Sequence, residues 1–145
     1  MSQTQFAFIK KENIPSRTVL QASIDQLGFD LKLDPEFTLF EDEGFFPCIL
    51  NGDSDVGFEI FYESVEDLIG GDEDEELKLL IGESDYAISL CWGGSFQDCA
   101  CVLLVSIALA KNFDATISYE GDASETIEGM LEGVEECFRE IKKQS

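Results

Sequence analysis

Carboxylates dominate the chemistry that the side chains of this sequence offer. Asp and Glu number 31 against 9 Lys and Arg, histidine is absent, and the formal net charge is −22. Without histidine the chain has no Ser-His-Asp or Cys-His nucleophile and no histidine-ligated metal. Paired carboxylates can serve in glycoside hydrolysis or two-metal catalysis, but no motif singles out one pair. The residue types therefore favour a binding protein over an enzyme, and we expect no catalytic residue, no cofactor and no metal.

The acidic residues are concentrated between Phe29 and Asp85, where 19 acids accompany two lysines and give a local balance of −17. Solubility needs a net charge of only about 2–8 in a small domain, and like charges destabilise a compact state. We therefore interpret the excess as a docking surface for a basic partner, with Phe40, Phe45 and Phe61 as candidate apolar anchors. A merely solvated acidic face is the alternative. The expected contact residues are Glu41, Asp42, Glu43, Phe45, Asp53, Asp55, Asp72, Glu73, Asp74, Glu75 and Glu76.

A calcium loop is a second interpretation of residues 72–83. Asp72, Asp74 and Glu76 stand at positions one, three and five of an EF-hand-like loop, and Glu83 stands at position twelve. Position six, where glycine makes the sharp turn, is Leu77. The sequence therefore predicts nonspecific attraction of cations more strongly than a specific calcium site.

Five cysteines, an odd number, occur without a CxxC motif or a signal peptide, so we expect free thiols and a cytoplasmic location. The longest nearly apolar run, 99–110, is too short to span a bilayer and is typical of a buried helix, which would bury Cys99 and Cys101. The net charge excludes general affinity for nucleic acid or an anionic membrane.

Hydrophobic periodicity predicts one domain over residues 1–145. Helical spacing predicts an N-terminal helix over about 16–28, a buried helix over about 95–111 and a C-terminal helix over about 124–143. Short helices are indicated around 65–69 and 75–81. Alternation predicts strands over 6–9, 29–33, 37–40, 45–50, 56–62, 86–92 and 113–119. Short turns between successive strands predict an antiparallel meander, so the class is α+β, a largely antiparallel sheet packed with helices.

Three parts of the chain together resemble the small cytoplasmic immunity proteins of bacterial toxin systems, especially those of contact-dependent growth inhibition. The first part is a helix that begins with Ile-Pro-Ser and ends with Leu-Gly-Phe-Asp-Leu. The second is a Gly-Phe-Phe-Pro-Cys strand followed by Gly-Phe-Glu, and the third joins Trp-Gly-Gly to an alanine-rich helix. The segments are residues 14–16 with 27–31, 44–48 with 57–59, and 92–94 with 108–110.

The resemblance implies a protein without enzymatic activity that binds a toxin domain one-to-one and neutralises it. The acidity favours a nuclease as the toxin, because a nuclease needs a basic surface to hold phosphates. An RNA-cleaving toxin is favoured over a DNA-cleaving one on the resemblance alone. An acidic mimic of nucleic acid and a cation-binding protein are the alternatives.

Overall fold

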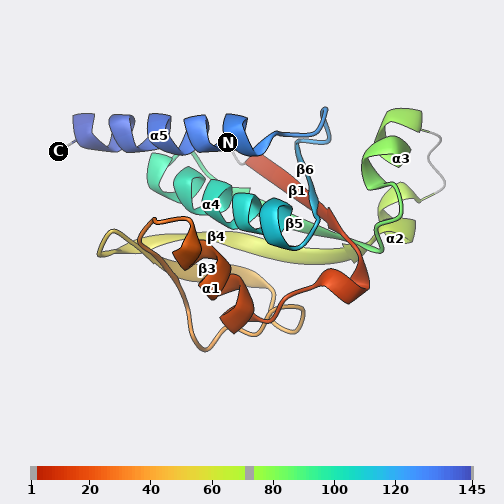
Figure 1. Ribbon diagram of the computed structural model, residues 1–145, viewed down its shortest axis with the longest axis horizontal. Coiled ribbons are helices and arrows are strands. Elements are labelled where there is room, and N and C mark those ends of the chain that lie inside the picture. Colours follow the sequence, from red (N-terminus) through yellow and green to blue (C-terminus); the bar gives the residue numbers. More distant parts are fainter. Residues whose placement is uncertain (1–2, 71–73, 145) are drawn as a thin grey trace.

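A six-stranded antiparallel sheet organises the residues that the computed structural model describes, 3–70 and 74–144 (Figure 1). The strand order is β2-β3-β4-β5-β1-β6. The strands are β1 (Gln3–Ile9), β2 (Leu31–Leu33), β3 (Gly44–Leu50), β4 (Asp53–Ser64), β5 (Tyr86–Trp92) and β6 (Thr116–Tyr119). Strands β2 to β5 form the expected meander, whereas β1 lies between β5 and β6 and pairs with both.

The β3–β4 hairpin turns at Asn51 and Gly52, whose φ angles are 51° and 86°. An Asn-Gly pair with positive φ at both positions is the favoured two-residue hairpin turn, because its twist matches that of the strands. The register shifts by one residue between Cys48 and Leu50, and beyond this irregularity Phe46 pairs with Phe58 on one face and Phe45 with Glu59 on the other.

Three helices, α1 (Arg17–Gln26), α4 (Phe96–Asn112) and α5 (Ile127–Lys143), form a layer on one side of the sheet (Figure 1). Each begins at a hydroxyl residue whose oxygen accepts a backbone N–H three residues on, as an N-cap does: Ser16, Ser95 and Thr126. Helix α4 is buried over most of its length, as its apolar composition predicts. One buried polar contact crosses this core, where the Gln5 amide donates to the Ser106 hydroxyl at 2.7 Å.

Two short helices lie on the opposite side of the sheet. They are α2 (Val65–Ile69) and α3 (Glu75–Ile81). The apolar side chains of α2 and α3 pack with Phe8 and Ala87 in a small core separate from the large one beneath α4. This second core covers the parts of β1 and β5 that lie beside the two helices. Elsewhere in the chain, a 3₁₀ turn, η1 (Lys11–Asn13), precedes α1.

The predicted α+β class is confirmed, and the described structure corrects several details of the sequence analysis. Strands β1 and β4 are longer than predicted, and β2 is shorter. Residues 37–40 form a loop that ends in a turn in place of a strand, because Phe37 packs on Phe46 at 4.0 Å between ring centroids. Helix α5 starts at Ile127, since the Glu125 N–H still donates to the Ile117 carbonyl. Strand β6 is shorter than predicted, and Cys99 is half-buried. Among the described residues, no helix has both the length and the apolar character needed to cross a membrane.

Candidate protein-docking site

The half of the sheet formed by β3 and β4 exposes apolar side chains on the face that points away from α4. Phe45, Ile49 and Phe61 are 58%, 43% and 39% exposed, although their strand neighbours Phe46, Leu50 and Ile60 are buried in the main core. We call this surface the open half-sheet. By alternation and register its members are Phe45, Pro47, Ile49, Asp55, Glu59, Phe61 and Glu63.

The Phe45 ring lies over Gly57, in the space that a side chain at this position would fill. A Cβ atom on Gly57 would lie 2.6 Å from Cζ of Phe45 and 2.5 Å from the Phe46 carbonyl oxygen, so only glycine fits. The Gly57 N–H in turn donates to Oδ1 of Asp98 on α4 at 3.0 Å. An exposed aromatic ring that packs on the sheet backbone has less conformational entropy to lose on binding than a free one, as suits an interface anchor.

Acidic residues surround these apolar side chains. Glu59 lies directly opposite Phe45 in the strand register, and Glu63 and Asp55 continue the same face towards the two ends of β4. Lys32 of β2, opposite Ile49, places its ammonium 3.3 Å from the Asp25 carboxylate on α1. The open half-sheet is thus an apolar centre with a strongly negative margin.

The structure does not bring the predicted contact residues into one cluster. Glu41, Asp42 and Glu43 lie near the C-terminal end of β4, where the Glu43 carboxylate accepts the Tyr62 N–H at 3.3 Å. Asp53 and Asp55 lie at the other end of β4, and nine residue steps of extended strand from Asp53 to Tyr62 span about 30 Å. Asp74, Glu75 and Glu76 begin α3, whereas Asp72 and Glu73 lie outside the described residues.

Three of these acids have local structural roles. Asp42 accepts the Thr38 N–H at 2.7 Å, and Asp53 accepts the N–H of Asp55 at 2.9 Å. Asp74 is the N-cap of α3 and accepts the backbone N–H groups of Glu76 and Leu77. Because Leu77 is inside that helix, residues 74–83 do not form the EF-hand-like loop considered above. The described residues contain no group of three or more metal-ligating side chains.

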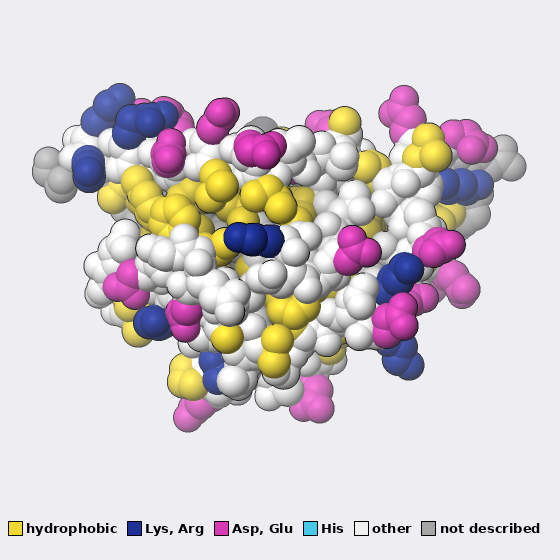
Figure 2. Space-filling model, in the orientation of Figure 1, with side chains coloured by type: hydrophobic (Ala, Val, Ile, Leu, Met, Phe, Trp, Pro, Cys, Tyr) yellow, Lys and Arg dark blue, Asp and Glu magenta, His cyan; other side chains and the backbone are white. Residues whose placement is uncertain are grey.

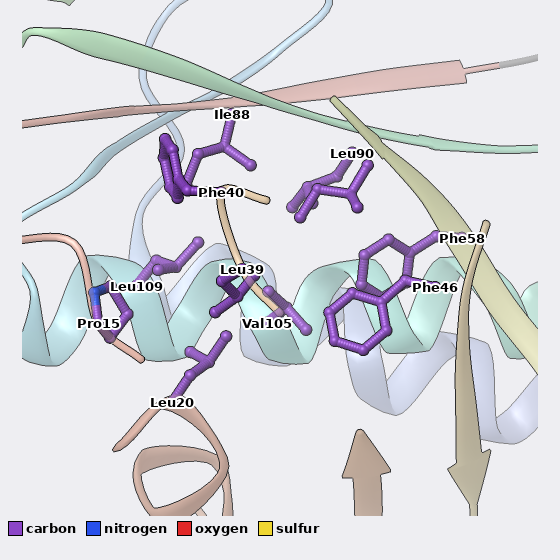
Figure 3. Close-up of a pocket in the computed structure, with 11 residues that line it drawn as sticks. Pro15, Leu20, Leu39, Phe40, Phe46, Phe58, Ile88, Leu90, Val105 and Leu109 are labelled. Carbon is purple, nitrogen blue, oxygen red and sulfur yellow. The ribbon is translucent and has the colours of Figure 1, made fainter. Parts of the chain in front are cut away.

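The three candidate aromatic anchors differ in their exposure to solvent. Phe45 and Phe61 are exposed, but Phe40 packs on Tyr62 at 4.3 Å and lines an apolar space inside the protein. That space has a volume of about 10 Å³, at most one water, and apolar side chains from α1, α4 and the sheet fill its walls (Figure 3). It belongs to the packed core and is no ligand site.

Sequence reasoning missed Pro47, Ile49, Glu59 and Glu63 as members of the site. The signal for them was the alternation of 44–50 and 56–63, which places every second side chain opposite the main core. Alternation identifies the face but cannot tell whether another element covers it.

The helix layer on the other side of the molecule also carries acidic side chains. Figure 2 shows that acids line α5 and the end of the molecule formed by α2 and α3, while apolar side chains gather where α5 meets α4. In α5 some of the acids are paired within the helix, as Glu136 is with Arg139 and Glu140 with Lys143. Acidity alone therefore does not distinguish α5 from the open half-sheet, whereas exposed aromatic side chains do.

Comparisons with known proteins identify no relative from which a function could be transferred. No protein family, curated protein or solved structure was found to match the chain. The open half-sheet and the charge of the chain are therefore the observations on which a function can be based.

Proposed function

We propose that this protein is an immunity protein that binds a basic toxin domain, a nuclease, and neutralises it without catalysis. The observation that supports the proposal is the open half-sheet, where exposed Phe45, Ile49 and Phe61 lie within a margin of carboxylates. Interface centres are typically aromatic and apolar, with polar or charged residues at the rim.

The charge argues for a basic partner rather than a second copy of this chain. Two copies meeting at the open half-sheet would bring Glu59 and its acidic neighbours together in a protein of net charge −22. Like charges brought together across an interface cost several kcal/mol. A basic partner would instead be attracted, with association rates of up to about 10⁸–10⁹ M⁻¹s⁻¹ at low salt.

A nuclease fits these requirements because it must carry a positive surface to hold phosphates. Acidic side chains of an inhibitor can occupy that surface, and the apolar centre then supplies the desolvated contact that slows dissociation. The proposal includes an RNA-cleaving toxin, which the resemblance to immunity proteins favours, and a cytoplasmic location, where a delivered nuclease meets its substrate.

The test starts from the reading frame immediately upstream of the gene, which we expect to encode a large exported protein with a basic C-terminal domain. That domain should co-purify with this protein in a one-to-one complex and lose its toxicity. In stopped-flow measurements the association rate should fall about tenfold or more between low and physiological salt. Absence of a complex contradicts the proposal, and a salt-independent rate contradicts the role of charge.

A further inference from the structure

A recess of about 570 Å³ opens at the C-terminal end of β4, where it shares Glu63 with the open half-sheet. Its volume lies in the usual range for ligand pockets. Its chemistry comes from three aromatic rings, two carboxylates and one lysine: Phe40, Tyr62, Tyr86, Glu43, Glu63 and Lys11.

The three rings form one packed group. Phe40 stacks on Tyr62 with ring centroids 4.3 Å apart, and it meets Tyr86 edge-on at 5.6 Å. The φ angle of Phe40 is 68°, a conformation that bulky residues rarely adopt, so packing holds this ring in place. The Tyr62 hydroxyl is buried beside the Phe40 amide and makes no hydrogen bond of normal geometry with the described residues.

Both carboxylates lack a cationic partner in the part of the chain that the structure describes. Neither Glu43 nor Glu63 forms an ion pair with a basic side chain of the described residues, and the Glu43 carboxylate accepts only the Tyr62 N–H. Burial raises the pKa of Tyr62 to about 12, and the negative charges of Glu43 and Asp42 add to the effect. Glu43, Glu63 and Lys11 together leave the recess with a net charge of −1.

We infer that this recess receives an arginine side chain of the basic partner. A guanidinium stacks on aromatic faces and donates hydrogen bonds to carboxylates, so it matches a recess that offers both. Glu63 joins the recess to the open half-sheet, because it lies on the same face of β4 as Phe61, whereas the rings of Phe40, Tyr62 and Tyr86 pack against the main core at this end of the sheet. The source of the arginine rests on the proposed function, whereas the cation-binding chemistry of the recess does not.

The experiment uses N-butylguanidinium as a probe of the whole protein, followed by ¹⁵N–¹H NMR at low salt. The amides of Tyr62, Glu63, Ser64 and Tyr86 should shift first and saturate together, and N-butylurea, the neutral analogue, should leave them unchanged. Shifts spread evenly over all acidic regions, or equal binding of the urea, would overturn the site.

Variants make the test specific. Glu43→Gln with Glu63→Gln should weaken binding of the probe about tenfold or more, because two charge-assisted contacts are lost. The matched control, Glu128→Gln with Glu132→Gln on α5, removes the same charge and should bind as the parent does. Lys11→Gln should tighten binding, because it removes the one cation that opposes the probe. An equal loss in both double variants, or no gain with Lys11→Gln, would refute the assignment.

The probe separates this inference from the proposed function, because no toxin is present in the titration. If the probe does not bind but the toxin domain does, the recess assignment is wrong and the proposed function stands. If the probe binds and the toxin domain does not, the proposed function fails and the cation site remains, with the partner's arginine excluded as its occupant.

Discussion

The sheet face that points away from α4 has two halves built on the same alternation but with different surroundings. On β1 and β5, helices α2 and α3 cover Phe8 and Ala87, which are completely buried. On β3 and β4 no described element covers the equivalent side chains, and Phe45 is 58% exposed. The chain thus forms a second hydrophobic core on the half made by β1 and β5, and it leaves similar side chains exposed to solvent on the half made by β3 and β4. Burial of the open half by a second protein would recover the apolar contacts that folding alone does not make.

The strongest test of this comparison is the stability of two Phe→Ala variants. Phe8→Ala should lower the free energy of unfolding by about 3–5 kcal/mol, because it empties a fully buried position. Phe45→Ala should cost about 0.5–1 kcal/mol, the value of a cross-strand surface contact. Urea denaturation followed by circular dichroism measures both. Equal losses in the two variants would show that the halves do not differ in the way described.

Charge reversal tests the open half as a docking surface. Asp55→Lys, Glu59→Lys and Glu63→Lys together should weaken binding of the basic toxin domain by more than about two orders of magnitude, because like charges then oppose each other. Reversal of Asp72, Asp74 and Glu76, suggested by acid density alone, is a poorer test because Asp74 is the N-cap of α3.

The control for this reversal is on α5, where Glu128→Lys, Glu132→Lys and Glu135→Lys make the same change in net charge. We expect this variant to keep protecting cells that receive the toxin. If the α5 variant loses protection and the β4 variant retains it, the partner binds the helix side and the docking assignment is wrong.

Alkylation of the cysteine thiols tests how α4 packs against β3 and α5, and the expected effect is smaller than those above. The sequence predicts that Cys99 and Cys101 both resist alkylation, but the structure separates them. Cys101 is fully buried and donates a hydrogen bond to Cys48, so its pKa is raised. Cys99 is half-buried and accepts a hydrogen bond from the Cys137 thiol, which lowers its pKa. Iodoacetamide followed by mass spectrometry should modify Cys99 and the half-buried Cys91 well before the other three. Fast labelling of Cys101 in the native protein would contradict this packing.

The smallest expected effect concerns the hydroxyl of Tyr62. Its pKa of about 12 means that this tyrosine should ionise later than an ordinary one in a titration followed at 295 nm. A folded-state pKa above the unfolded value of 10 stabilises the protein below pH 10, and this stabilisation is lost as the pH rises from 10 to about 12. Glu43→Gln should bring the ionisation to lower pH, because the Glu43 charge raises the pKa. An unchanged titration in that variant would place Glu43 away from the hydroxyl.

Local patterns in the sequence predicted most of the elements but not the arrangement of the site. The starts of the helices expected from about 16 and 95 and the short helices at 65–69 and 75–81 were correctly placed, because hydroxyl caps and helical spacing act over a few residues. Residues 37–40 were wrongly predicted as a strand because the partner of Phe37 is in β3, and nothing local encodes that contact.

The candidate site was predicted in part for the same reason. Phe45 and Phe61 could be proposed as anchors from their places beside acidic turns, and their exposure agrees with that role. Ile49 and Glu59 were missed because exposure of the open half-sheet depends on where α2 and α3 stop. The separation of the acidic groups along β4 likewise follows from sheet register rather than from spacing in the sequence.

The position of β1 between β5 and β6 has a consequence for synthesis on the ribosome. Gln3 pairs with Trp92 and Gln5 with Tyr119, so β1 emerges well before β5 and β6 and has no sheet partner until they have been made. At about 5–20 residues per second, the apolar segment 6–9 waits on the order of 5–20 s, while β2, β3 and β4 can pair with near neighbours. Until β5 arrives, β1 is an unpaired strand able to join other chains. Early capture of this segment by a chaperone should therefore determine how much protein reaches the folded state.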